Sequence, residues 1–211
     1  MLRLINGTAA RRYLVSGNVA RRYLTTAVSD RGGAIITGPA GTPIHLPPAE
    51  GAVGPVTVEP FGEVDSYKKA IFCPATSILR TSTHVGTDDD GRVFKGLVKD
   101  GMLPVAGAIS KEEAKQHARN AGLRLLSTIH HALDGDMSRV EQVIKLTGLV
   151  NGVGDGQFHA HGFVINGCSE VLIEAFGPER GVGVRVCSGT ASLFGAVSCD
   201  VELRVRPAAG D

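Results

Sequence analysis

Apolar positions between residues 110 and 135 recur every three or four residues, which is the period of an amphipathic helix. Ser110 and Glu113 have the spacing of a capping box, so the helix is expected to begin there. Asp134 and Gly135 predict its end, because glycine readily adopts the left-handed conformation that follows a last turn. The apolar stripe consists of Ala114, Ala118, Ala121, Leu125, Ile129 and Ala132.

A second, shorter helix is expected further along the chain. Asn166 is a favourable N-cap residue, and a helix that starts there would be stopped by Gly177-Pro178. The apolar residues of this helix are Leu172, Ile173 and Phe176.

Several segments have the composition of β-strands. Residues 77–82 and 92–98 flank the turn sequence Asp90-Gly91, which predicts a hairpin between them. Residues 143–150 are mostly apolar and predict a largely buried strand.

Two closing strands alternate between side-chain types, so each has two distinct faces. In the first, valines at 182, 184 and 186 face one way, and Gly183, Arg185 and Cys187 face the other. In the last, the apolar face consists of Val197, Cys199, Val201, Leu203 and Val205. The polar face consists of Ser198, Asp200, Glu202, Arg204 and Arg206. The order of hairpin, helix, strand, helix and two strands predicts an α+β fold with the helices on one face of a sheet.

Composition and charge narrow the function classes. The hydrophobic fraction is 43%, and no apolar run approaches the roughly 20 residues needed to span a bilayer, so we expect a soluble protein without a membrane partner. The net charge of +1 is unevenly distributed. Residues 1–31 hold 6 of the 22 basic residues and 1 of the 21 acidic residues. Residues 32–211 therefore hold 16 basic and 20 acidic residues, which gives this part a net charge of −4. A body of that sign repels phosphate backbones, so direct nucleic-acid binding is not expected.

The chain divides by composition into three segments. Residues 1–30 are rich in Arg, Ala, Leu, Ser and Thr, which predicts a mitochondrial targeting segment cleaved near residues 23–29. A basic RNA-binding arm is the alternative, whereas arginines interrupt every stretch that could serve as a secretory signal. Residues 31–63 are dense in Gly and Pro, which predicts a linker or an arm wrapped on a neighbour, and residues 64–211 form the folded domain.

No metal and no organic cofactor is expected. His159 and His161 have no Cys or carboxylate at ligand spacing beside them, so a polar loop or strand end is favoured over a metal site. The acidic run at residues 88–90 lacks the further ligands of a calcium loop and favours a solvated turn. Four cysteines without a C-x-x-C pair favour reduced, mostly buried thiols; they are Cys73, Cys168, Cys187 and Cys199.

Several motifs together resemble the Rid family (YjgF-like, endoribonuclease L-PSP-like, reactive-intermediate deaminases), of which this chain would be a divergent member. Residues 135–150 are similar to the strand that follows the family's first helix, and residues 166–177 to the second-helix motif of one subgroup. Residues 185–193, followed by Asp200-Val-Glu202, look like the terminal motif of that subgroup. The resemblance implies a chorismate-mutase-like Rid fold, with a mixed sheet and two helices on one face, assembled as a homotrimer.

The resemblance also implies a site. Arg185 falls where the family binds a substrate carboxylate, which a guanidinium matches as a bidentate fork, and the backbone N–H of Cys187 would be a neighbouring donor. Asp200 falls where an acidic residue holds or activates water, and we expect it opposite Arg185 on one face of the closing strands. Ser82 falls on the serine of the hairpin motif, and Tyr67 on a tyrosine that reaches into the neighbour's site.

The implied function is either hydrolysis of small imine or enamine carboxylates to 2-oxo acids and ammonia, as by a deaminase-like hydrolase, or binding of such carboxylates. The hairpin motif Ser-Gly-Gln appears here as Ser82-Thr83-His84, however, and Arg185 could instead form an ion pair with Asp200 or Glu202. A non-catalytic trimeric component of a larger mitochondrial assembly, such as a ribosome or RNA-processing complex, is therefore the rival. Endoribonuclease activity ranks third, because the sequence places no His/His or His/Lys pair for cleaving RNA.

Overall fold

In the computed structural model, residues 33–49, 67–88, 90–99, 107–152 and 158–208 are described, together with the backbone of residues 27–28, 55–58 and 62–65. The sequence of the predicted targeting segment therefore lies outside the described residues, apart from the short strand β1 (Ala27–Val28). No helix in the described part of the chain is long and apolar enough to cross a membrane.

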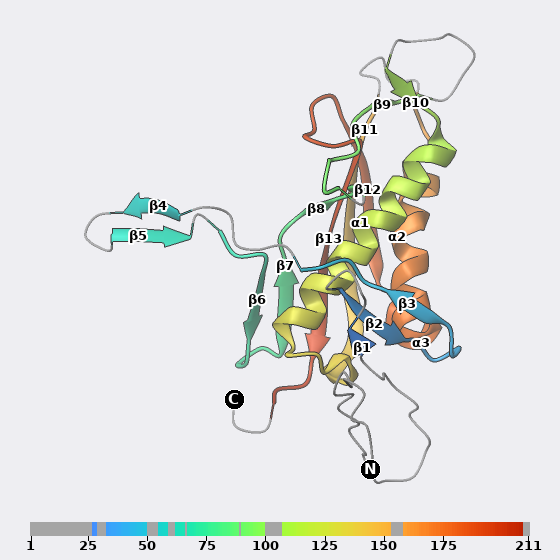
Figure 1. Ribbon diagram of the computed structural model, residues 1–211. Helices are drawn as coiled ribbons and strands as arrows, with labels where there is room; N and C mark the ends of the chain where they lie inside the picture. The colour runs from blue at the N-terminus through green and yellow to red at the C-terminus, as the bar shows by residue number, and fades with distance from the viewer. Residues whose placement is uncertain are drawn as a thin grey trace, which may run out of the picture.

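A mixed six-stranded sheet forms the centre of the domain (Figure 1). Its path of neighbouring strands is β12 (Val184–Thr190), β11 (Val140–Asn151), β13 (Val197–Val205), β7 (Ile78–Thr81) and β6 (Ala70–Cys73). The short strand β8 (His84–Val85) also pairs with β13. The β11–β12 pair is parallel, and the other pairs of this sheet are antiparallel.

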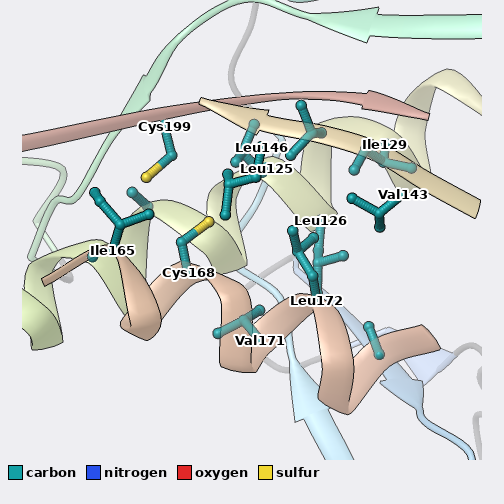
Figure 2. Packing of buried hydrophobic residues seen from close by; sticks show 14 of the residues in the cluster. Leu125, Leu126, Ile129, Val143, Leu146, Ile165, Cys168, Val171, Leu172 and Cys199 are labelled. Atoms are coloured by element: carbon teal, nitrogen blue, oxygen red, sulfur yellow. The ribbon is translucent and has the colours of Figure 1, made fainter. Parts of the chain in front are cut away.

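Two helices, α1 (Lys111–Ala132) and α2 (His161–Phe176), cover one face of this sheet (Figure 1). Their apolar side chains point towards the sheet and towards each other, as Figure 2 shows for Leu126 and Leu172. The helices approach closely at Gly167, where an added Cβ would collide with the Lys115 backbone oxygen. The fold is therefore α+β with helices on one face of a mixed sheet, as the element order predicts.

The predicted first helix is confirmed at both ends. The Ser110 side chain accepts a hydrogen bond from the Glu113 backbone nitrogen at 3.1 Å, as a capping residue does. After Leu133 the backbone turns left-handed at Asp134 and Gly135, with φ of 51° and 85°. Local capping chemistry thus suffices to define this helix.

The predicted start of the second helix is wrong. α2 begins at His161, and its N-cap residue Ala160 makes no side-chain capping bond. Asn166 lies within the helix, and its side chain bonds to Arg185 instead. The end is as expected: α2 stops at Gly177, and a short helix, α3 (Pro178–Gly181), follows.

The predicted hairpin between residues 77–82 and 92–98 is also wrong. β7 pairs with β6 before it, while β9 (Leu97–Val98) pairs in parallel with β10 (Ala108–Ile109). The acidic turn itself forms: the Asp88 carboxylate accepts bonds from the backbone nitrogens of Asp90 and Arg92 at 3.0 and 2.8 Å. The chain does fold back across this turn, with Thr87 opposite Val93, but the first arm is residues 86–88 and not residues 77–82.

Residues 33–49, which we call the strap, form a third layer on the side of the helices away from the sheet (Figures 1 and 2). The strap contains β2 (Ala34–Thr37) and β3 (Pro43–His45), and its Ile36, Ile44 and Leu46 are buried. The Ser127 hydroxyl of α1 donates to the Pro47 carbonyl at 2.7 Å. This part of the expected linker or arm therefore packs on the chain's own helices; β4 (Pro55–Val58) and β5 (Gly62–Asp65) form a separate two-stranded sheet.

A Gly38→Ala substitution tests the strap. A Cβ at Gly38 would collide with the Glu174 backbone oxygen of α2, so the strap would have to shift. Overpacking of this kind is expected to cost about 2 kcal/mol, which lowers the midpoint of thermal unfolding by about 4–8 °C. The matched control is Thr42→Ala, an exposed position in the same turn. An unchanged midpoint for Gly38→Ala would contradict the packing of the strap on α2.

Candidate functional site

The side chain of Arg185 faces the helices. Arg185 lies on the edge strand β12, where it pairs in register with Leu146 of β11, which is buried under α2. Its Nη1 donates to Asn166 Oδ1 at 2.7 Å and to Ser169 Oγ at 3.1 Å, both on α2. Among the described residues, no hydrogen-bond acceptor or ion-pair partner is found for Nε or Nη2. The guanidinium is thus fixed by one nitrogen while its Nε–Nη2 edge stays free.

A cavity of about 260 Å³ opens beside Arg185, between α2, β11 and the turn into β12. Its polar end consists of Arg185, Asn166 and Ser169. The remaining lining residues are Val143, Leu146, Leu172, Ile173, Gly181, Val182 and Gly183. One cationic group at the rim of an otherwise apolar cavity suits a small amphipathic anion.

Asp200 lies on the opposite face of the sheet from Arg185. Leu146 pairs with both Arg185 and Val201, so these three side chains share the helix-facing side, and Asp200 points the other way. Burial raises the pKa of the Asp200 carboxyl, although a side-chain hydrogen bond with Thr147 and the charge of Lys145 oppose this shift. Within one chain, the expected placement of Arg185 and Asp200 on a common face is therefore not found.

Ser82 and Tyr67 lie together at the far edge of the sheet. The Ser82 hydroxyl donates to the Lys68 carbonyl at 2.6 Å, and Lys69 Nζ donates to the Tyr67 hydroxyl at 3.2 Å. β11 and β13 separate this edge from β12. A single chain therefore brings neither residue to Arg185.

Cys187 is half-buried on β12, on the same face as Arg185. Burial raises the pKa of its thiol, and the nearby charge of Arg185 opposes this only in part. A raised pKa reduces the thiolate fraction, so the side chain is a poor nucleophile. Within the described ranges, no cluster of three or more His, Cys, Asp or Glu side chains is placed to hold a metal ion.

Asn166 and Ser169 are site residues that sequence reasoning missed. They stand three positions apart on α2, so they lie on one face of that helix and can hold one guanidinium together. This spacing is visible in the sequence, but Asn166 is also a favourable N-cap residue, and the sequence alone favours that role. The apolar part of the cavity could not be found from the sequence, because its walls come from separate elements.

No protein-family model matches the sequence. Protein TCP17 of Trypanosoma cruzi is 35% identical over 108 residues, which span 50% of this chain and 66%, just under two thirds, of that protein. Solved structures are similar in fold. A protein of unknown function from Agrobacterium tumefaciens has a TM-score of 0.58 at 25% identity, covering 66% of this chain and 82% of its own. A putative endoribonuclease from Shewanella oneidensis has a TM-score of 0.59 at 19% identity, covering 76% and 91%.

These likenesses agree with the strand order and the helix layer described above. The chain has the chorismate-mutase-like Rid fold that its motifs predict. The fold does not by itself define an activity, so the function has to be argued from Arg185 and its surroundings.

Proposed function

We propose that this protein binds small imine or enamine carboxylates at Arg185 and promotes their hydrolysis to 2-oxo acids and ammonia. The observation that carries the proposal is a guanidinium fixed through Nη1 whose Nε–Nη2 edge has no partner among the described residues. Two parallel N–H groups match the two oxygens of a carboxylate, and a pre-oriented fork loses little entropy on binding. Binding through the carboxylate would leave the imine carbon accessible to water.

The proposed site also includes a second copy of the chain. On β12, Val184 and Val186 are 67% and 45% exposed on the face away from the helices, which suits coverage by another subunit. Tyr67 and Ser82 lie at the opposite edge of the sheet, so a neighbour's edge placed beside β12 would bring them towards Arg185. A closed ring of such head-to-tail contacts is the homotrimer that the motifs imply.

The direct test generates the imine in solution. An amino-acid oxidase acting on a small amino acid releases the 2-imino acid, whose decay is followed with and without the purified full chain. We expect the protein to accelerate the decay, and the 2-oxo acid and ammonia to appear in equal amounts. Decay at the uncatalysed rate would remove the enzymatic proposal.

Asn166 is proposed as a positioning residue, because its Oδ1 accepts a hydrogen bond from Arg185 Nη1 and so holds the guanidinium in place. Asn166→Ala is expected to raise KM about tenfold and to change kcat less, since one hydrogen bond to a charged group contributes about 1.5 kcal/mol. The control is Glu179→Ala on α3, an exposed position without a hydrogen-bond or ion-pair partner among the described residues. Equal losses in the two variants, or a fall in kcat at constant KM, would contradict this role.

A non-catalytic role is the second candidate, because Arg185 and Asp200 lie on opposite faces of the sheet. A carboxylate site without an adjacent acidic group would bind a metabolite and leave it unchanged, as a regulatory or structural subunit does. The predicted targeting segment would bring such a subunit into a mitochondrial assembly. Sedimentation of mitochondrial extract separates the two: co-migration with large particles supports the assembly, and a free trimer supports the enzyme. Ribonuclease activity rests only on the name of the Shewanella protein and on the resemblance.

A further inference from the structure

The cavity beside Arg185 has an asymmetry that restricts its ligand. The guanidinium, Asn166 and Ser169 are joined by hydrogen bonds at one end, whereas the rest is lined mainly by aliphatic side chains such as Leu146, Leu172 and Ile173. A polar ligand of the same size would lose its hydration in the interior without gaining partners there, which is unfavourable. The interior therefore suits an alkyl group.

The size of the cavity limits the length of that group. At about 30 Å³ for each water-sized group, 260 Å³ holds about eight or nine such groups. Cavities that bind drug-sized molecules are larger, typically about 300–1,000 Å³. A carboxylate of about five or six carbons fits, with its head group at Arg185 and its tail between α2 and β11.

We infer that the cavity between α2 and β11 is a subsite for the aliphatic side chain of the substrate, so the protein selects medium-length aliphatic carboxylates over pyruvate-sized ones. The subsite rests on the proposed function in one respect, which is that the carboxylate of the substrate lies at Arg185. The subsite lies within one chain, since α2, β11 and the turn into β12 supply all of its described lining. Its selectivity therefore does not depend on how subunits assemble.

Ile173 offers a way to change the cavity without disturbing the deepest core. It lines the cavity but is only half-buried, unlike Leu172. Ile173→Ala enlarges the space, and Ile173→Phe reduces it. The control is Glu179→Ala on α3, an exposed position that does not line the cavity.

The experiment titrates the full chain with straight-chain carboxylates from acetate to octanoate and follows binding by NMR chemical shifts. Affinity is expected to rise about fourfold with each methylene up to five or six carbons and then to level off, since each buried methylene contributes about 0.8 kcal/mol. Ile173→Ala is expected to move the optimum to longer chains, Ile173→Phe to shorter ones, and Glu179→Ala to leave it in place.

Two results would overturn the subsite: affinity independent of chain length, or the same optimum in all three variants. If Arg185→Met still abolished binding in that case, Arg185 would bind the carboxylate as proposed. The cavity would then be a packing defect and not a binding site. The reverse outcome, chain-length selectivity without imine hydrolysis, supports the subsite and removes the enzymatic proposal. The two proposals therefore fail separately.

Discussion

Replacing Arg185 by alanine is expected to lower kcat/KM for hydrolysis of a small 2-imino acid about 100-fold. The variant removes both donors of the free Nε–Nη2 edge, and hydrogen bonds to a charged group contribute about 1.5–3 kcal/mol. The loss should appear mainly in KM, because the carboxylate keeps its charge throughout the reaction and the interaction is similar in ground and transition states. Steady-state kinetics with an oxidase-generated imine measures both constants.

Two further variants distinguish specific recognition of the carboxylate by the Arg185 guanidinium from the loss of one positive charge. Arg185→Lys keeps the cation but replaces the planar fork by a point charge, and it should recover only part of the affinity. Arg204 is an exposed arginine on β13 that has no hydrogen-bond or ion-pair partner among the described residues, so Arg204→Ala should retain wild-type kinetics. If Arg185→Ala hydrolysed the imine at the wild-type rate, Arg185 would serve only to tie β12 to α2.

The parts of the fold that local chemistry determines were predictable. The capping box at Ser110 and the left-handed turn at Gly135 define α1, because both act within a few residues of the helix ends. The apolar face of β13 was also predictable, since alternation with period two leaves Val201 and Leu203 on the buried side. Each of these features needs no knowledge of a distant segment.

The relative orientation of two strands is not a local property. Alternation divides β12 and β13 into two faces each, but only the register of β11 with both strands decides which faces coincide. The valines of β12 would have been assigned to the helix side by hydrophobicity, yet Val184 is 67% exposed and Arg185 faces α2. An edge strand can expose its apolar face in this way when another molecule covers it, which supports the proposed assembly.

The arrangement around Arg185 was not predictable from the sequence. The motif identifies Arg185, but its contacts with Asn166 and Ser169 depend on how α2 packs on β12. The packing of the strap was not predictable for a related reason. Its Gly- and Pro-rich composition indicates extended structure but not what that structure packs against. Ile36 is buried only because both helices cover it.

Acidification below pH 6.5 is expected to destabilise the protein through His84, which is 2% exposed between β8 and α1. Burial, assisted by the charge of Lys69, lowers the pKa of His84 to about 4 from an ordinary value near 6.5. Its Nδ1 donates to the Ser82 carbonyl at 2.8 Å, and its Nε2 accepts from the Thr128 hydroxyl at 2.7 Å. The fold thus selects the neutral ring with its proton on Nδ1.

The unfolded chain takes up a proton at His84 near pH 6.5, whereas the folded chain resists protonation until about pH 4. The free energy of unfolding should therefore be unaffected by this residue above pH 6.5, fall by about 1.4 kcal/mol for each pH unit below it, and level off near pH 4 after a total loss of about 3 kcal/mol. Urea unfolding at a series of pH values measures this slope.

His84→Gln has no titrating group at this position, so its free energy of unfolding should fall by about 3 kcal/mol less than that of the wild type between pH 6.5 and pH 4. Thr128→Val should lower the free energy of unfolding at every pH but keep a dependence on pH. If the free energy of unfolding had the same dependence on pH in the wild type and in His84→Gln, the His84 ring would accept a proton as readily in the folded chain as in the unfolded chain. The neutral ring would then not be what holds the Ser82 segment against α1.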